Sequence, residues 1–244
     1  MIAALVLLAF VGCWEAYAQF SGIDDFVLPA PSAIGQALYD DSALLWSNFT
    51  VTAVEMGLGI LAALALGLAC AVAIHFSDGL RRGLYPLLIG SQTIPIPIIA
   101  PLLVAWFGFD LAPKIAIIAL VCFFPIAVPT VDALRRVDPD HHKLMRSFGA
   151  SRWQTFAIVE ARAALPGLVT GAKLSIVFAT IAAVLAEWAG SENGLGHLIL
   201  QALPQFETAR AYAAVLILSA FAVALFCLIA AAERRLTPWT KTAA

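Results

Sequence analysis

Residues 131–170 read VDALRRVDPDHHKLMRSFGASRWQTFAIVEARAALPGLVT, and this stretch decides the architecture. It is a polar, helix-prone segment of about 40 residues that separates two long apolar stretches. A loop of this length can form folded structure of its own. We therefore expect a compact knob that stands outside the membrane and offers a contact surface to a soluble protein.

The composition places the chain among membrane proteins. Of its 244 residues, 62% are hydrophobic and 12% are charged, whereas a soluble domain has about 25% charged residues. The formal net charge of −2 says little, because the distribution of charge along the chain carries the information. The four cysteines lie inside apolar stretches without a C-x-x-C spacing, so we interpret them as small buried hydrophobic residues.

The apolar stretches predict an all-α integral membrane fold. A helix needs roughly 20 apolar residues to cross the hydrocarbon core, and lipid leaves exposed backbone groups without partners. The alternating pattern of a membrane barrel is missing from the sequence. We expect about six transmembrane helices in a single domain over residues 1–244. The candidate spans are residues 2–20, 53–76, 84–107, 115–131, 164–188 and 211–232.

Residues 2–20 have two interpretations. A secretory signal peptide also has an apolar core and ends in small residues, as Ala16-Tyr17-Ala18 does here. Such a peptide begins with basic residues, however, and no Lys or Arg precedes Arg81 in this sequence. We therefore expect a retained first span.

The basic residues predict the orientation of the spans. Of the 14 Lys and Arg residues, all but Lys114 and Arg210 lie in or beside the gaps on one side of the six stretches. Cytoplasmic loops are enriched in Lys and Arg. We therefore expect residues 131–170 and both termini to lie in the cytoplasm.

The third candidate span is interrupted by proline. Residues 91–97 read SQTIPIP, and a further proline follows at Pro101. Proline removes a backbone donor and clashes with the preceding turn, so this helix must be kinked or broken. Two interpretations stay open, because a kink can be merely structural. In the functional one the bend lines a water-filled path, to which Gln92, Thr93 and Pro95 belong.

Two short helices are expected inside residues 131–170. The first begins at residues 138–140, where Pro139 suits a first helical turn, and ends before Gly149, which stands where a left-handed C-cap residue is wanted. Ser151 is an N-cap candidate for the second helix. Residues 165–167, Leu-Pro-Gly, are then expected to bend the chain into the fifth span.

The second short helix carries two aromatic residues, Trp153 and Phe156. They can anchor the helix in an apolar groove of a partner, as helix-in-groove recognition requires. They can equally be residues of the aromatic belt at the membrane surface. The residues alone leave both interpretations open.

The sequence lacks the motifs of an energy-converting enzyme. No Gly-x-x-x-x-Gly-Lys-Ser/Thr occurs, so energy must come from a partner or from an ion gradient. A gradient-driven carrier usually has ionisable residues near the bilayer midplane. The few ionisable residues of the spans lie near predicted span ends: Glu15, Glu55, His75, Lys173 and Glu187. His141 and His142 are adjacent and face different directions on a helix, so we expect solvent-exposed histidines and neither a metal nor a catalytic site.

Glu187 is the carboxylate with the most specific setting. It lies at the outer end of the fifth span, shortly before Gly190 and Gly194. One interpretation is an interfacial acid that faces water. The other is an outer gate, or a docking contact for a protein that delivers the solute.

The segment 147–154, SFGASRWQ, resembles the cytoplasmic EAA loop of ABC importer permeases, with Val159 ten residues after Gly149 and Leu-Pro-Gly at 165–167 beyond it. Further matching stretches follow in order along almost the whole chain: LPAP at 28–31, APLLVAWFG at 100–108, FFP at 123–125, AEW at 186–188 and GLG at 194–196. Together they resemble the nitrate, sulfonate and taurine branch and the thiamine-precursor (hydroxymethylpyrimidine) branch of the binding-protein-dependent transport permeases.

The resemblance implies an assembly in a bacterial inner membrane. Two permease copies, expected to be identical, form the pathway across the lipid, and two ABC ATPase subunits beneath them bind ATP and Mg. A periplasmic or lipid-anchored solute-binding protein delivers the solute. The chain itself would hold no cofactor, would catalyse no reaction and would bind no nucleic acid.

The resemblance also implies which residues couple the permease to its ATPase: Gly149, Ala150, Ser151, Arg152 and Trp153. The sequence departs from the family pattern at two places. Lys143-Leu144-Met145 stands where the Glu-Ala-Ala lies, and Arg162 stands where the proline of the first Leu-Pro would be. Glu187 matches an Ala-Glu segment of the family.

The expected function is therefore that of a permease subunit of an ATP-driven importer. The solute implied by the branch is a sulfonate-, nitrate- or taurine-like anion or a thiamine pyrimidine precursor. The alternatives are a standalone, gradient-driven secondary transporter and an integral-membrane scaffold without transport.

Overall fold

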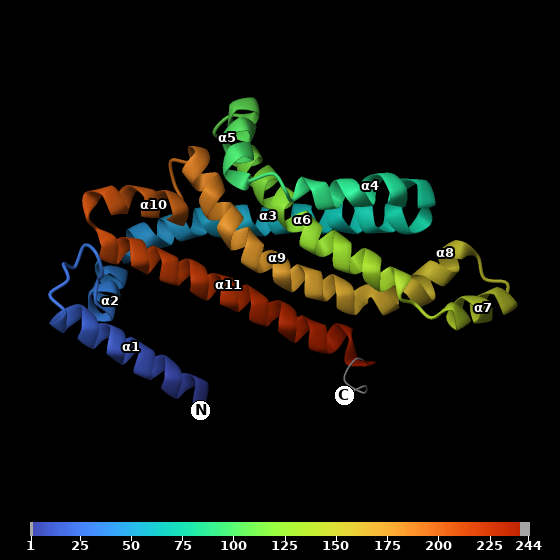
Figure 1. Cartoon of the computed structure of the whole chain (residues 1–244), viewed down its shortest axis with the longest axis horizontal. Coiled ribbons are helices and arrows are strands. Elements are labelled where there is room, and N and C mark those ends of the chain that lie inside the picture. Colours follow the sequence, from blue (N-terminus) through green and yellow to red (C-terminus); the bar gives the residue numbers. More distant parts are fainter. Residues whose placement is uncertain (1, 240–244) are drawn as a thin grey trace.

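The computed structural model describes residues 2–239 as an elongated bundle of helices (Figure 1). The predicted all-α fold is confirmed for this part of the chain. The elements are α1 (Ile2–Phe20), α2 (Pro31–Asp40), α3 (Ser42–Phe76), α4 (Asp78–Ser91), α5 (Ile96–Phe107), α6 (Leu111–Arg135), α7 (Pro139–Ser147), α8 (Arg152–Thr155), the π-helical turn η1 (Phe156–Glu160), α9 (Ala161–Gly190), α10 (Leu195–Ala202), the 3-10 turn η2 (Leu203–Gln205) and α11 (Thr208–Leu236).

Four helical segments of residues 2–239 are long and apolar enough to cross a membrane. They are α3, α6, the continuous run Arg152–Gly190 and α11, and all four extend along the length of the molecule (Figure 1). The pair α4 and α5 passes the same test but is bent by 101°. α1 is a shorter apolar helix over Leu5–Phe20. The expectation of about six crossings therefore stays a prediction.

The core lies where α6 packs against α3 and α9. The apolar part of α6 is 56% buried, whereas that of α11, at the periphery, is 17% buried. Two glycines of α3 permit the close approach, because a Cβ on Gly59 would overlap Ile118 and a Cβ on Gly67 would lie 2.9 Å from Ile126. Small residues let membrane helices come this close.

We expected residues 165–167 to bend the chain into the fifth span, but they form no turn between two elements. α8, η1 and α9 form one helical run from Arg152 to Gly190, with Pro166 inside it. Gly167 packs so tightly on α6 that a Cβ there would lie 2.6 Å from the Ala133 Cβ and 2.7 Å from the Pro129 carbonyl. Contact with α6 therefore supports a continuous helix where the local sequence favours a break.

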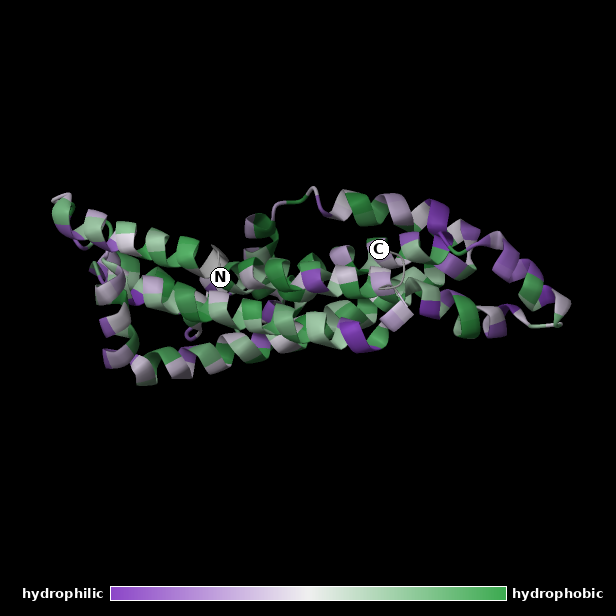
Figure 2. Cartoon of the chain, turned by 90° about the horizontal axis from the view of Figure 1, so that it is seen from below, coloured by the Kyte–Doolittle hydropathy of each residue, from purple (hydrophilic) through white to green (hydrophobic). Residues whose placement is uncertain are grey.

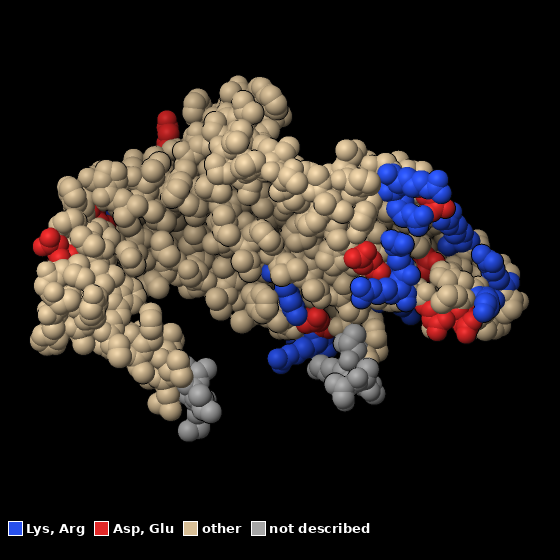
Figure 3. All heavy atoms as spheres, in the orientation of Figure 1, with Lys and Arg blue, Asp and Glu red and all other residues tan. Residues whose placement is uncertain are grey.

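The two ends of the bundle differ in charge. Lys and Arg gather at the end that carries α7 and α8 (Figure 3), and the same end is the most hydrophilic part of the chain (Figure 2). The two exceptions at the other end are both neutralised. Arg210 Nε lies 2.7 Å from Asp41 Oδ2, and Lys114 Nζ lies 2.7 Å from Glu55 Oε1.

Candidate functional site

The knob at the basic end has the helix–turn–helix form that the sequence predicts. Asp138 caps α7 by accepting a hydrogen bond from the Asp140 backbone, with Pro139 in the first turn. Gly149 follows α7 with φ at +69°, the left-handed conformation of a C-cap glycine. Ser151 then caps α8 in a reciprocal capping box with Gln154.

The knob presents apolar side chains to its surroundings. α7 buries none of its residues, and Leu144, Phe148 and Trp153 are 54%, 77% and 62% exposed. Large apolar side chains clustered on an otherwise polar surface mark an interaction site. The exposed face fits both interpretations given above, contact with a groove of a partner and contact with the membrane surface.

The predicted coupling residues divide into two groups. Gly149, Ala150 and Ser151 make the turn between α7 and α8. Arg152 and Trp153 instead pack on the end of α3: the Arg152 guanidinium donates to the His75 carbonyl at 3.2 Å and lies 4.9 Å from the Phe76 ring centre. The Trp153 ring lies 5.7 Å from that of Phe76. The second group therefore joins the knob to a transmembrane helix.

His142 is not the solvent-exposed side chain that we expected. It is half-buried, and its Nδ1 lies 3.3 Å from Glu160 Oε1, while His75 Nε2 lies 2.6 Å from Glu160 Oε2. The prediction failed because Glu160 comes from η1, which local sequence does not place beside α7. Within residues 2–239, no group of three or more His, Cys, Asp or Glu side chains is arranged to hold a metal ion.

The proline-rich third span is broken, as predicted. Gln92, Thr93 and Pro95 all lie in the break between α4 and α5, and their side chains are exposed. The Thr93 hydroxyl donates to the Gly90 carbonyl at 2.8 Å, and Pro95 is extended as the N-cap of α5. α5 consequently stands across the long axis of the bundle (Figure 1). Their place on a water-filled path stays a prediction.

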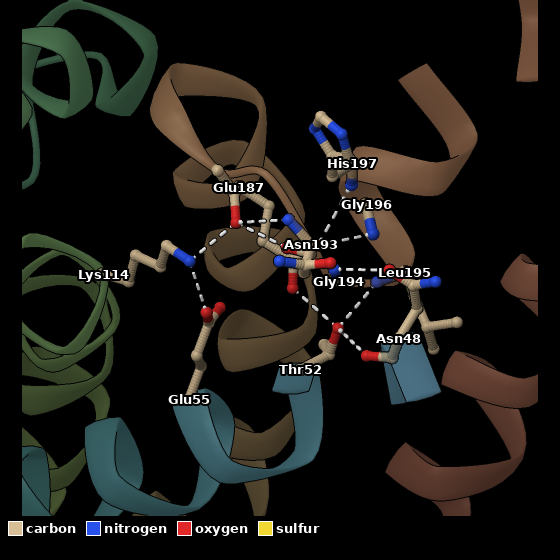
Figure 4. Close-up of polar contacts among 11 residues, drawn as sticks. Asn48, Thr52, Glu55, Lys114, Glu187, Asn193, Gly194, Leu195, Gly196 and His197 are labelled. Atoms are coloured by element: carbon tan, nitrogen blue, oxygen red, sulfur yellow. Dashed lines mark hydrogen bonds and ion pairs between the residues drawn. The ribbon is translucent and has the colours of Figure 1, made fainter. Parts of the chain in front are cut away.

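Glu187 is the centre of a buried polar cluster at the other end of the bundle (Figure 4). Its side chain is buried, so the interpretation as an acid that faces water is wrong. Thr52 donates to one carboxylate oxygen at 2.6 Å, and the backbone N–H groups of Gly196 and His197 donate to the other at 2.6 and 3.1 Å. These amides belong to the first turn of α10, where the helix dipole favours a negative charge. A gate at Glu187 stays a prediction, but the enclosed carboxylate offers no docking contact in this conformation.

The turn between α9 and α10 is pinned to α3 by two further contacts. Asn48 Oδ1 accepts from the Gly194 N–H at 2.7 Å, and Thr52 Oγ1 accepts from the Leu195 N–H at 2.8 Å. Gly194 has φ at +119°, and a Cβ there would overlap the Glu187 carboxylate. Glycine is therefore required both by the backbone and by the space.

A buried ion pair completes the cluster. Lys114 Nζ lies 2.7 Å from Glu55 Oε1 and donates to the Ser191 hydroxyl at 2.6 Å. We expected Glu55 near the end of its span, but it lies well inside α3, because this helix begins at Ser42 rather than at residue 53. Lys114 is likewise inside α6 and buried, so it is no ordinary loop cation.

Of this cluster, our sequence interpretation named only Glu187 as a site residue. It noted Glu55 and Lys114 for their charge and the GLG turn for its resemblance, without connecting them with Glu187. The side chains of α3 share a signal that we missed: Asn48, Thr52 and Glu55 follow one another at spacings of four and three. Such residues lie on one face of a helix. A polar face on an apolar membrane helix points toward protein rather than lipid, and this pattern would have identified the site.

Comparison with known proteins places the chain. Residues 56–238 match the family described as binding-protein-dependent transport system inner membrane component. The chain is 35% identical to a probable ABC transporter permease protein of Haemophilus influenzae, over 87% of each chain. It is 32% identical to the formylaminopyrimidine transport permease protein ThiX of Halalkalibacterium halodurans, over 97% of this chain and 95% of that one.

Two further comparisons agree. The taurine transport system permease protein TauC of Escherichia coli is 28% identical over 93% of this chain and 85% of its own length. An inward-facing structure of the MetNI methionine ABC transporter shares the fold, with a TM-score of 0.66 and 21% identity over 82% of this chain and 97% of that one. The chain therefore belongs to the binding-protein-dependent transport system inner membrane components, and it is a multi-pass permease subunit of an ABC importer, with ATP hydrolysis in a separate chain.

Proposed function

We propose that partner ATPase subunits drive this permease through the coupling loop, residues 131–170. The observation that carries the proposal is the exposed helix–glycine–helix knob at the basic end of the bundle. Its outward apolar side chains, Leu144 and Phe148, suit a groove in a soluble protein. Arg152 and Trp153 then pass a displacement of the knob to α3, which they contact.

The complete importer contains more chains than this one. Two copies of the permease, expected to be identical, surround the pathway in the membrane lipid, and two ABC ATPase subunits bind ATP and Mg. A periplasmic or lipid-anchored binding protein brings the solute to the opposite end. The break at Gln92, Thr93 and Pro95 faces the pathway, and the Glu187 cluster acts as part of the outer gate.

The coupling loop and both termini lie in the cytoplasm. The gathering of Lys and Arg at the α7 and α8 end supports this orientation (Figure 3), since cytoplasmic segments are enriched in these residues. The pairing of Lys114 and Arg210 with carboxylates supports it as well, because it leaves little free positive charge at the outer end.

The solute is a thiamine pyrimidine precursor or a sulfonate-, nitrate- or taurine-like anion. Similarity to the formylaminopyrimidine permease covers more of both chains, at higher identity, than similarity to the taurine permease. This difference favours the pyrimidine. Ligand screening of the cognate binding protein would decide between the two.

Cysteine cross-linking tests the ATPase contact. Phe148→Cys places a thiol on the knob, and Tyr39→Cys provides the control, because it is also an exposed aromatic position, 82% against 77%, but lies on α2 near the other end. In a cysteine-free permease, a short cross-linker should join position 148 to the ATPase and leave position 39 unlinked. Cross-linking at position 39, or none at position 148 with the ATPase bound, would contradict the proposal.

A further inference from the structure

Glu160 joins three separate elements at the end of the bundle that carries α7 and α8. Its side chain is 7% exposed. One carboxylate oxygen lies 2.6 Å from Nε2 of His75, in the last turn of α3, and the other lies 3.3 Å from Nδ1 of His142, on α7. Glu160 itself ends η1, which leads directly into α9. A single carboxylate, at the start of the helix that continues as α9, thus contacts both α7 and the last turn of α3.

The π-helical turn decides where this carboxylate points. A π turn holds one residue more than an α-helical turn. It therefore rotates the preceding segment by about 100° relative to an uninterrupted α-helix. In an uninterrupted α-helix, Glu160 and the side chains of α8 could not both point toward α3 as they do here. Turns of this kind are frequent at functional sites, and here the turn directs Glu160 into the gap between α3 and α7.

The same turn places the aromatic contacts of α8. The Phe156 ring lies 5.1 Å from that of Phe76 and 5.3 Å from that of Trp153. The Arg152 guanidinium lies 4.9 Å from the centre of the Phe76 ring. α8 and η1 are therefore held to the end of α3 by edge-on and tilted ring contacts. α7, in contrast, buries no residue, so the contact of His142 with Glu160 at 3.3 Å is a specific tie between α7 and the bundle.

The surroundings of Glu160 make its charge important. A pocket of about 490 Å³ lies beside it and is lined by His75, His142, Arg146 and Arg152 among others, with Glu160 as the single acidic side chain of that lining. Removal of this carboxylate would leave only cationic or neutral groups facing one another. α7 and α3 would then lose their common partner, and Arg146 and Arg152 would lose the one carboxylate of this lining.

We propose that Glu160 is a positioning residue of the transport cycle. It ties α7, the last turn of α3 and α9 into one unit that moves as a whole, which we call the lever. Displacement of α7 then moves two transmembrane helices together rather than bending the knob alone. The inference rests on the proposed contact between the coupling loop and the ATPase, and it adds the step by which the movement enters the membrane.

The test compares variants in the reconstituted importer with its ATPase and binding protein. Glu160→Ala removes the carboxylate, Glu160→Gln keeps its shape without its charge, and His142→Ala removes one arm. Asp140→Ala is the matched control, because it removes a carboxylate from α7 whose partner, Lys143, lies exposed on the same helix. The measurements are ATPase copurification, basal hydrolysis, solute molecules transported per ATP, and the distance distribution between spin labels at the exposed positions 147 on α7 and 66 on α3.

Glu160→Ala should retain its ATPase and keep basal hydrolysis within about twofold, while solute per ATP falls at least about fivefold and the distance distribution broadens. Glu160→Gln should fall between this variant and the wild type, which keeps the test usable if the alanine variant fails to fold. The double variant with His142→Ala should be no worse than Glu160→Ala, since Glu160→Ala already removes the contact with His142. Asp140→Ala should match the wild type.

Wild-type solute per ATP and wild-type distances in Glu160→Ala and Glu160→Gln, with the ATPase bound, would overturn the lever alone. A wild-type permease that fails to bind its ATPase would overturn the proposed function, and the lever with it.

Discussion

The carboxylate of Glu187 and the hydroxyl of Thr52 lie 2.6 Å apart, although 135 residues separate them in the chain. Together with the His75–Glu160 contact, this bond means that the run containing α9 is tied to α3 at two places, one toward each end of the bundle. The Thr52–Glu187 bond is buried, where a hydrogen bond is electrostatically stronger than in water. We therefore expect α3 and α9 to move as one body during transport.

Gly194→Ala should destabilise the permease. Its φ of +119° strains any residue with a Cβ, at a cost of about 1–3 kcal/mol, and the added carbon would overlap the Glu187 carboxylate. The expected result is a fall of at least about 4 °C in the thermal unfolding midpoint of the purified permease. Gly57→Ala, where a Cβ meets nothing within 4 Å, is the matched control and should not lower the midpoint. Equal midpoints for the two variants would count against the proposed packing.

Lys114→Met should be more harmful than removal of the whole ion pair. The single change leaves the Glu55 carboxylate buried without its partner, which costs about 3–5 kcal/mol, whereas replacing both members by apolar residues is often neutral. Thermal unfolding of Lys114→Met, Glu55→Met and the double variant measures the difference. We expect the double variant to be more stable than Lys114→Met. A double variant that loses the sum of both single effects would show that the two side chains do not interact.

Substitutions of Gly149 test backbone conformation without changing side-chain packing. A Cβ at this position meets nothing within 4 Å, yet φ is +69°. Gly149→Val should therefore misplace α8, at a cost of roughly 1–2 kcal/mol, and reduce transport and ATPase binding while the helices still insert. Gly149→Asn should remain close to wild type, because asparagine tolerates the left-handed region. If the valine variant binds and stimulates its ATPase normally, the turn has no part in coupling.

Accessibility of single cysteines tests the orientation. In a cysteine-free background, Asp40→Cys on α2 should react with an impermeant thiol reagent in spheroplasts, and Lys143→Cys on α7 should react only after permeabilisation. Both positions are exposed, so burial cannot explain a difference. Equal labelling of the two in intact spheroplasts would reverse the assigned orientation.

Local signals in the sequence were sufficient to predict the helices and the turn of the coupling loop. Asp138, Gly149 and Ser151 each act on their own few neighbours, through caps and a left-handed residue. Their structural roles could therefore be predicted one at a time. Proline at position 95 likewise breaks its helix by local chemistry.

Long-range contacts set the features that we missed. Glu187 is buried because Thr52 and the turn at Gly194 cover it, and Glu160 reaches His142 because a π turn rotates it there. The π turn has no local sequence signature. The polar face of α3 that covers Glu187 has one, in the spacing of Asn48, Thr52 and Glu55, but the pairing of this face with Glu187 has none. The continuity of α9 through Pro166 similarly depends on its contact with α6 rather than on helix propensity.

Solute uptake into proteoliposomes tests the central claim most directly. The permease alone should show no accumulation driven by a proton or sodium gradient. Cognate ATPase with ATP inside and binding protein outside should produce uptake that persists with an ionophore and disappears without ATP. Accumulation by the permease alone that collapses with the ionophore would contradict the account and would make Glu55 and Glu187 the first candidates for ion carriers.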